Sequence, residues 1–349
     1  MATMRERRSA PQAIRVRLLA PGRLSRPSTA TAWTCPLTAD PLAPAPTSSE
    51  TPTGPDEHNR IGVGIASIII AVFCFSIGDA IGKYLGHAGY AAFQIVFFRY
   101  LFGLLPALIF VWHSGIGSLR TRRPHLHLLR AGLLFSALSS FFAAIKAMPL
   151  AEAVAIAFTA PLFITALSQP LLGEPVGARR WAAVLFGFGG ALIALRPGTE
   201  AFRQESLLVL LAALCFALAM LLTRRMSRTE TNAAMLTYST GGACLISSPF
   251  MIMVWQPTEP VHLAILVGLG CIGGCAAYFM IRAYRHAPAA VIAPFEYTGL
   301  IWAAIIGWIV WRDQPHPAVW AGAALIAAAG VYIAQREAAV RRRELAATG

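Results

Sequence analysis

From residue 61 onward, the chain alternates between long apolar stretches and short polar loops. A bilayer core about 30 Å thick requires about twenty apolar residues in each helix that crosses it. Stretches of roughly that length occur at 61–84, 90–112, 126–148, 150–172, 180–196, 206–223, 233–255, 262–284, 288–311 and 316–335. The pattern therefore predicts an all-α integral membrane protein with ten transmembrane helices.

The second five stretches resemble the first five. Shifting the numbering by 139 or 141 superposes like residues: Pro149 on Pro288, Ala151 on Ala290, Thr159 on Thr298, Glu174 on Asp313, Trp181 on Trp320, Cys74-Phe75 on Cys215-Phe216 and Lys83 on Arg224. Because each half has an odd number of spans, the two copies enter the membrane in opposite senses. Such inverted repeats are an architecture of secondary transporters, which bind solutes at a central site between the halves.

Composition and charge place the chain in a bilayer and orient it. Hydrophobic residues make up 56% of the chain and charged residues 13%, whereas soluble domains carry about a quarter charged residues. Lysine and arginine collect on the cytoplasmic side of a membrane. With the N-terminus inside, the outer loops hold Lys83, Lys146, Arg196, Arg203 and Arg312, whereas the inner segments hold Arg120, Arg122, Arg123, Arg179, Arg180, Arg224, Arg225, Arg228, Arg282, Arg285, Arg336, Arg341, Arg342 and Arg343.

This bias predicts that both termini are cytoplasmic. The net charge of +13 then reflects topology and contact with anionic lipid head groups. It does not indicate nucleic-acid binding, because the basic residues are dispersed among the loops.

The polar head differs in kind from the rest of the chain. Residues 1–30 contain seven arginines and a single acid, Glu6, and residues 41–55 are rich in Pro, Ser and Thr. Such a segment cannot form an apolar core, so we expect a disordered basic tail; a mis-predicted start and an organellar transit peptide are the alternatives. The predicted organisation is a tail at 1–60, repeats at 61–196 and 206–335, and a basic cytoplasmic tail at 336–349.

Cysteine and histidine positions argue against a metal site or a disulfide framework. Five of the six cysteines lie inside apolar stretches. Cys271 and Cys275 have a spacing that would suit a soft metal, but their glycine-rich surroundings favour close helix packing. His125 and His127 lie in a basic inner loop, where we expect solvated side chains. We therefore expect no metal and no cofactor.

A resemblance to one family rests on the end of the first repeat. Lys146-Ala147-Met148-Pro149-Leu150-Ala151-Glu152-Ala153 leads into Pro161, and Gly173-Glu174, Trp181, Gly187, Gly189 and Gly190 follow. With Phe97-Phe98-Arg99-Tyr100 and the Asp79/Lys83 pair, this resembles the EamA family of the drug/metabolite transporter (DMT) superfamily. The second repeat keeps Ala287-Pro288-Ala289-Ala290 and Trp320, but it has Leu300 in place of Pro161 and Arg312-Asp313 in place of Gly173-Glu174.

The resemblance implies a ten-helix carrier of small organic metabolites. Members that share the Asp79/Lys83 pair and the Pro294-Phe295-Glu296-Tyr297-Thr298 segment resemble importers of S-adenosylmethionine and riboflavin. The resemblance carries little information about the substrate of this chain.

Ionisable residues inside the spans are candidates for the site, because a charge in hydrocarbon costs at least about 2.5–3.5 kcal/mol. Glu296 lies about eight residues into the ninth span, between Pro294 and the hydroxyl donor Tyr297. It either binds a cationic substrate group or carries a proton, or it neutralises a buried arginine. Arg99, deep in the second span, either meets an anionic part of the substrate or neutralises Glu296 or Asp79.

The remaining candidates have equally plain structural alternatives. Asp79 and Lys83 share one helix face, so they either neutralise each other or line the outer mouth. Tyr278, Trp302 and Tyr238 could stack on a planar ligand, although packing and lipid contact are commoner uses of such residues. Glu152 and Lys146, near the outer ends of the third and fourth spans, are expected to be solvated.

The function that these observations favour is secondary transport of a small organic metabolite across the cytoplasmic (inner) membrane. No phosphate-cradling G-x-x-x-x-G-K-[ST] loop is present, so the chain does not hydrolyse ATP. Proton coupling through Glu296 or Asp79 and uncoupled exchange are both compatible with the sequence. A membrane enzyme is the first alternative, but it would need catalytic groups clustered in a long loop. A non-transporting receptor or scaffold is the second. Substrate, direction and oligomeric state, including a homodimer, stay open.

Overall fold

The computed structural model describes residues 55–121, 123–173, 176–197, 203–226, 229–287 and 289–348. The predicted tail up to residue 54 lies outside these ranges. The described residues all belong to one compact unit, Pro52–Gly349. Within them every regular element is a helix, in agreement with the predicted fold class.

The helices follow the predicted apolar stretches closely. The first half contains α1 (Pro55–His87), α2 (Ala92–Ser114), the short η1 (Ile116–Leu119), α3 (Pro124–Ile145), α4 (Leu150–Ala157), α5 (Ala160–Leu172) and α6 (Ala178–Leu195). The second contains α7 (Glu205–Met226), α8 (Asn232–Met253), α9 (Pro260–His286), α10 (Ala289–Glu296), α11 (Thr298–Trp311) and α12 (Pro317–Thr348). Two ends differ from the prediction: α1 begins inside the predicted tail, and α12 continues past residue 335.

Nine segments among the described residues are long and apolar enough to cross a membrane, with α4–α5 counted as one segment and α10–α11 as another. The remaining long helix, α8, has 22 residues. It carries Thr237, Ser239 and Thr240 followed by Gly241 and Gly242, which dilute its hydropathy.

The two broken helices occupy equivalent positions in the two halves. The first is interrupted at Phe158 and Thr159, between α4 and α5, and the second at Tyr297, between α10 and α11. Phe158 and Tyr297 are 139 residues apart. The hydroxyl of Thr159 donates to the carbonyl of Ile156 at 2.7 Å, and that of Thr298 donates to the carbonyl of Phe295 at 2.6 Å. The repeat read from the sequence thus includes the hydroxyl-to-carbonyl bond at the break.

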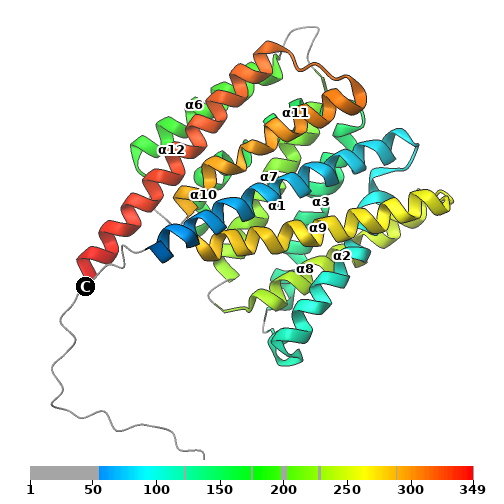
Figure 1. Ribbon diagram of the computed structural model, residues 1–349, viewed down its shortest axis with the longest axis horizontal. Helices are drawn as coiled ribbons and strands as arrows, with labels where there is room; N and C mark the ends of the chain where they lie inside the picture. The colour runs from blue at the N-terminus through cyan, green and yellow to red at the C-terminus, as the bar shows by residue number, and fades with distance from the viewer. Residues whose placement is uncertain are drawn as a thin grey trace, which may run out of the picture. The chain divides into compact units, whose positions relative to one another are not determined.

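Helix packing follows the same two-fold relation. In Figure 1, α1 lies alongside α9 and α6 alongside α12. The counterpart of the α1–α9 pair, α7 with α3, is also packed together, and α2 packs on its own counterpart α8. Most of the interhelical packing therefore joins one half to the other.

Glycine permits the closest of these approaches. A Cβ atom on Gly190 of α6 would lie 2.7 Å from Cβ of Leu325, and one on Gly322 of α12 would lie 2.5 Å from the carbonyl oxygen of Gly190. Small residues at such crossings let helix backbones come together in a membrane, where no hydrophobic driving force between helices is available.

Candidate functional site

The break in the second broken helix brings Glu296 and Tyr297 to its centre. Glu296 is the last residue of α10, and Tyr297 is the N-cap of α11. Pro294, two residues earlier, lacks an N–H group and weakens the helical ladder here. The ring of Tyr297 lies 4.7 Å from the ring of Phe158, its repeat counterpart, measured between centroids. The two breaks therefore face each other between the halves.

The carboxylate of Glu296 accepts a hydrogen bond from the hydroxyl of Tyr284 on α9. Tyr284 is 44% exposed, whereas Glu296 is partly buried. Among the described residues no arginine forms an ion pair with Glu296, so its predicted alternative as the partner of a buried arginine is not what the structure shows. Among the described residues the hydroxyl of Tyr284 is thus the hydrogen-bond donor to this acid, and a neutral phenol leaves the carboxylate able to bind a cation or a proton.

Arg99 on α2 lies against two glycines. Cβ atoms built on Gly78 of α1 and Gly273 of α9 would come within 3.1 Å of Nη1 and 3.7 Å of Nη2, respectively. Its Cζ atom lies 5.7 Å from the ring centroid of Phe142 on α3. Nη1 is buried and has no hydrogen-bond partner. Arg99 interacts electrostatically with Asp79, but among the described residues the two form no ion pair.

Lys83 pairs with an acid from the second half of the chain. Its Nζ lies 2.6 Å from Oδ2 of Asp313, just after α11, and it also donates to the carbonyl of Met148 at 3.1 Å. The ammonium group stands 4.7 Å from the ring centroid of Trp311. The predicted neutralisation of Asp79 by Lys83 is therefore wrong. The i, i+4 spacing allows that contact, but a carboxylate from the other half is better placed.

The three aromatic candidates differ in their burial and in their hydrogen-bond partners. Trp302 on α11 packs at 63° to Phe73, with 4.9 Å between the ring centroids, and its indole Nε1 is buried without a partner. Tyr278 is 60% exposed and packs edge-on to Phe279. Tyr238 donates to the carbonyl of Leu119, the last residue of η1. Of the three, Trp302 alone presents an unused donor in the helical interior.

One end of the bundle is the end at which α1 meets α2, and it is called the α1–α2 end below. Polar contacts at this end join the two halves. Gln94 is fully buried, and its amide group bonds the backbone of Gln256 in both directions, at 2.8 and 3.1 Å. Glu152 is 8% exposed and faces Arg196 at 3.7 Å. The prediction of a solvated Glu152 is wrong, because the chain after α6 returns a guanidinium over α4. Lys146 is exposed, as expected.

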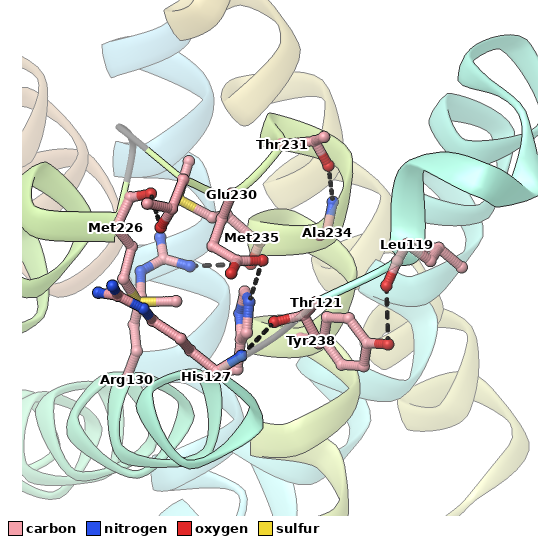
Figure 2. Close-up of polar contacts among 12 residues, drawn as sticks. Leu119, Thr121, His127, Arg130, Met226, Glu230, Thr231, Ala234, Met235 and Tyr238 are labelled. Carbon is pink, nitrogen blue, oxygen red and sulfur yellow. Dashed lines mark hydrogen bonds and ion pairs between the residues drawn. The ribbon is translucent and has the colours of Figure 1, made fainter.

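The opposite end, the α2–α3 end, has its own buried polar group (Figure 2). Nε2 of His127 lies 3.2 Å from Oε2 of Glu230, and both side chains are almost fully buried. The prediction of a solvated His127 is therefore wrong, although His125 is exposed. The partner of the buried His127, Glu230, comes from the α7–α8 loop and lies 103 residues further along the chain.

Sequence reasoning missed Arg130, which lies one helical turn from His127 (Figure 2). Its guanidinium donates to Thr223 of α7 at 2.6 Å, to the carbonyl of Met235 at 2.8 Å and to Ser239 of α8. The signal in the sequence was an arginine inside the apolar stretch 126–148. Its partners tie α3, α7 and α8 together.

No group of three or more potential metal-binding side chains occurs in the described part of the chain. Cys271 and Cys275 are both free thiols on α9. The arrangement as a whole is a bundle of apolar helices with paired breaks, and its unneutralised charges lie inside. It defines an integral membrane protein built from two helical repeats.

The comparisons with known proteins name the class. The chain matches the EamA-like transporter family over residues 62–196 and 204–335, and it belongs to this family. It is a transporter and not an enzyme. A relative from Rickettsia felis named "S-adenosylmethionine uptake transporter" is 30% identical, covering 80% of this chain and 96% of its own.

A second relative, from Rhizobium johnstonii and named "Riboflavin transporter", is 32% identical over 80% of this chain and 94% of its own. A crystal structure matches with a TM-score of 0.55 at 20% identity, over 82% of this chain and 99% of its own, and so shares the fold. With these bacterial relatives, the apolar helices identify an integral protein of the inner membrane.

Proposed function

We propose that this protein is a secondary carrier of a small organic metabolite and works by alternating access between its halves, 61–196 and 206–335. The observation that carries the proposal is the pair of helix breaks that face each other through Phe158 and Tyr297. In transporters built from inverted repeats, discontinuous helices form the substrate site near the middle of the bilayer. The halves would rock about this region, exposing it to one side and then to the other.

The proposal includes α8 as a tenth span. Its 22 residues are enough to cross the bilayer, and Arg130 together with the packing against α2 compensates for its polar side chains. Ten spans return the C-terminus to the side of the N-terminus. The arginine bias of the loops supports cytoplasmic termini, with the α1–α2 end facing outward.

Within this frame, Glu296 is the proposed coupling residue. A carboxylate at a helix break, which among the described residues accepts a hydrogen bond from a phenol and forms no ion pair, can exchange a proton or bind a cationic substrate group. Tyr297 and Trp302 would supply a hydroxyl, an indole N–H and two aromatic faces for the organic part of the substrate. Lys83 would hold the outer end, because its charge is already matched by Asp313.

The relatives indicate the size of the substrate. Two differently named groups, S-adenosylmethionine and riboflavin transporters, match about equally well, so we propose a metabolite of that size range without choosing between them.

Uptake into proteoliposomes tests the proposal. Purified protein reconstituted in sealed vesicles should move at least one of labelled S-adenosylmethionine and riboflavin faster than protein-free vesicles. An imposed pH gradient should change that rate if protons are coupled. A properly inserted protein that moves neither compound nor any member of a broad metabolite panel would contradict the proposal.

A further inference from the structure

The charges inside the bundle are unequally satisfied. Lys83 has Asp313, Arg130 has three acceptors, and Glu296 has the hydroxyl of Tyr284. Arg99 and Asp79 differ from these. Among the described residues neither takes part in a hydrogen bond or an ion pair, although they carry opposite charges and interact electrostatically.

Two opposite charges in a medium of low dielectric attract strongly, so contact is the expected outcome when nothing holds them apart. Among the described residues no ion pair joins Arg99 and Asp79, and the guanidinium has other neighbours. The guanidinium of Arg99 lies against the backbone at Gly78 and Gly273 and over the face of Phe142. It thus keeps a buried Nη1 without an acceptor. A buried donor without a partner costs about 1–3 kcal/mol, and more when it is charged.

A molecule that carries a carboxylate and an ammonium group on one carbon atom would satisfy both residues at once. The carboxylate would receive the fork of N–H donors from Arg99, and the ammonium group would face Asp79. A purely anionic or purely cationic ligand would satisfy one residue and leave the other buried and unpaired, a costly arrangement.

We propose that Arg99 and Asp79 form the subsite for a zwitterionic α-amino-acid group of the transported solute. Phe142 supplies an apolar wall beside this group. The inference rests on the proposed transport function and narrows its substrate class. A solute with an amino-acid end is favoured over an uncharged ring system such as that of riboflavin.

Binding is measured first, because it does not depend on flux. Purified wild-type protein in nanodiscs is titrated with S-adenosylmethionine, with L-methionine, and with two analogues that lack the carboxylate (3-(methylthio)propylamine) or the ammonium group (4-(methylthio)butanoate). The variants are Arg99→Gln, Asp79→Asn, the conservative Arg99→Lys and the control Arg179→Gln, which removes an exposed arginine near the start of α6. Thermal unfolding shows which variants remain folded.

We expect L-methionine to bind at least tenfold more tightly than either analogue. Asp79→Asn and Arg99→Gln should each weaken S-adenosylmethionine binding at least tenfold, Arg99→Lys should weaken it less, and Arg179→Gln should leave it unchanged. Equal binding of the three methionine-like probes would overturn the proposal. So would a failure of both zwitterionic probes to bind, or tight binding to folded Asp79→Asn and Arg99→Gln proteins.

Uptake assays separate this inference from the function on which it rests. Charge-dependent binding without flux would retain the subsite and refute the carrier. Uptake of riboflavin that is insensitive to both substitutions, with no binding of zwitterions, would retain the carrier and refute the subsite.

Discussion

The helices α4–α5 and α10–α11 are two copies of one broken helix, and they differ in the residues at the break. The first has Ala157 and Phe158, and the second has Glu296 and Tyr297 at the same positions of the repeat. The hydroxyl-to-carbonyl bonds of Thr159 and Thr298 are the same in both. The shared residues form the break, and the differing ones supply its chemistry. In this protein the symmetric positions explain the fold, whereas candidate functional residues lie where the symmetry fails.

The largest expected effect comes from removing the charge that only the second break has. Glu296→Gln keeps the shape of the side chain but cannot ionise, so uptake into proteoliposomes should fall at least about tenfold, or about 1.4 kcal/mol in the barrier. Any pH dependence should disappear as well. Glu259→Gln is the control, because the Glu259 side chain is 75% exposed in a loop. Normal uptake by the Glu296 variant would show that the asymmetry has no functional role.

The contact that anchors the end of the second broken helix comes next. Lys83→Met removes the cation that pairs with Asp313, and it also removes the hydrogen-bond donor to the carbonyl of Met148. We expect a loss of about 2–3 kcal/mol, below the range for fully buried pairs because the side chain of Asp313 is 20% exposed. Thermal unfolding in detergent measures this loss. Asp313→Asn in the Lys83→Met background should then cost less than it does alone, and strictly additive effects would refute the pairing.

Gly330 on α12 tests the packing of the tyrosine that replaces Phe158. A Cβ atom at Gly330 would collide with the hydroxyl of Tyr297. Gly330→Ala should therefore destabilise the protein by about 1–3 kcal/mol through overpacking. Adding Tyr297→Phe, which places a phenylalanine at this position in both breaks, should recover most of the loss in thermal unfolding. Gly189→Ala is the control, since nothing lies within 4 Å of its added Cβ; an equal loss there would contradict the explanation.

The two threonines should behave as equals. Thr159→Val and Thr298→Val each remove one hydroxyl from a carbonyl at the break, so each should cost about 1 kcal/mol of unfolding free energy. We expect the two values to agree to within about 0.5 kcal/mol. A clearly larger cost at one site, measured by denaturation under identical conditions, would show that the two breaks are not structurally equivalent.

Effects of about the same size or smaller are expected at the residues that end α5 and α11. Gly173 has φ of 71°, and Arg312, its repeat counterpart, has φ of 58°. This left-handed conformation favours glycine. Gly173→Ala should cost about 1 kcal/mol. Arg312→Gly should raise the free energy of unfolding by a few tenths of a kcal/mol at most. The gain is small because the substitution also removes the guanidinium that lies 5.3 Å from the ring centroid of Trp308. Opposite signs in a thermal shift assay would confirm the comparison.

The sequence predicts the helices and the repeat well because both depend on local patterns. Long apolar stretches locate the spans to within a few residues, apart from the start of α1 and the end of α12. The shift of 139 residues pairs Thr159 with Thr298, whose bonds in the structure are the same. The interruption of each helix is harder to predict, since Pro294 has no proline counterpart in the first repeat.

The partners of charged residues could not be predicted in the same way. Lys83 has Asp79 four residues away, yet it pairs with Asp313, 230 residues along the chain. His127 looks like a loop residue until Glu230 is placed beside it. Such pairs are set by how α1 meets α11 and how α3 meets the α7–α8 loop, which no local pattern records. The roles proposed for Glu296, Arg99 and Asp79 stay predictions until transport is measured.

Arg130 has a consequence for the order in which the chain is built. Its acceptors, Thr223 and Ser239, are synthesised 93 and 109 residues after it. At about 5–20 residues per second, α3 emerges roughly 5–20 s before these partners exist. An arginine in the second turn of α3 can wait at the head groups during that time. We therefore expect α3 to reach its final depth only after α7 and α8 have inserted, so that the second half completes the membrane insertion of the first.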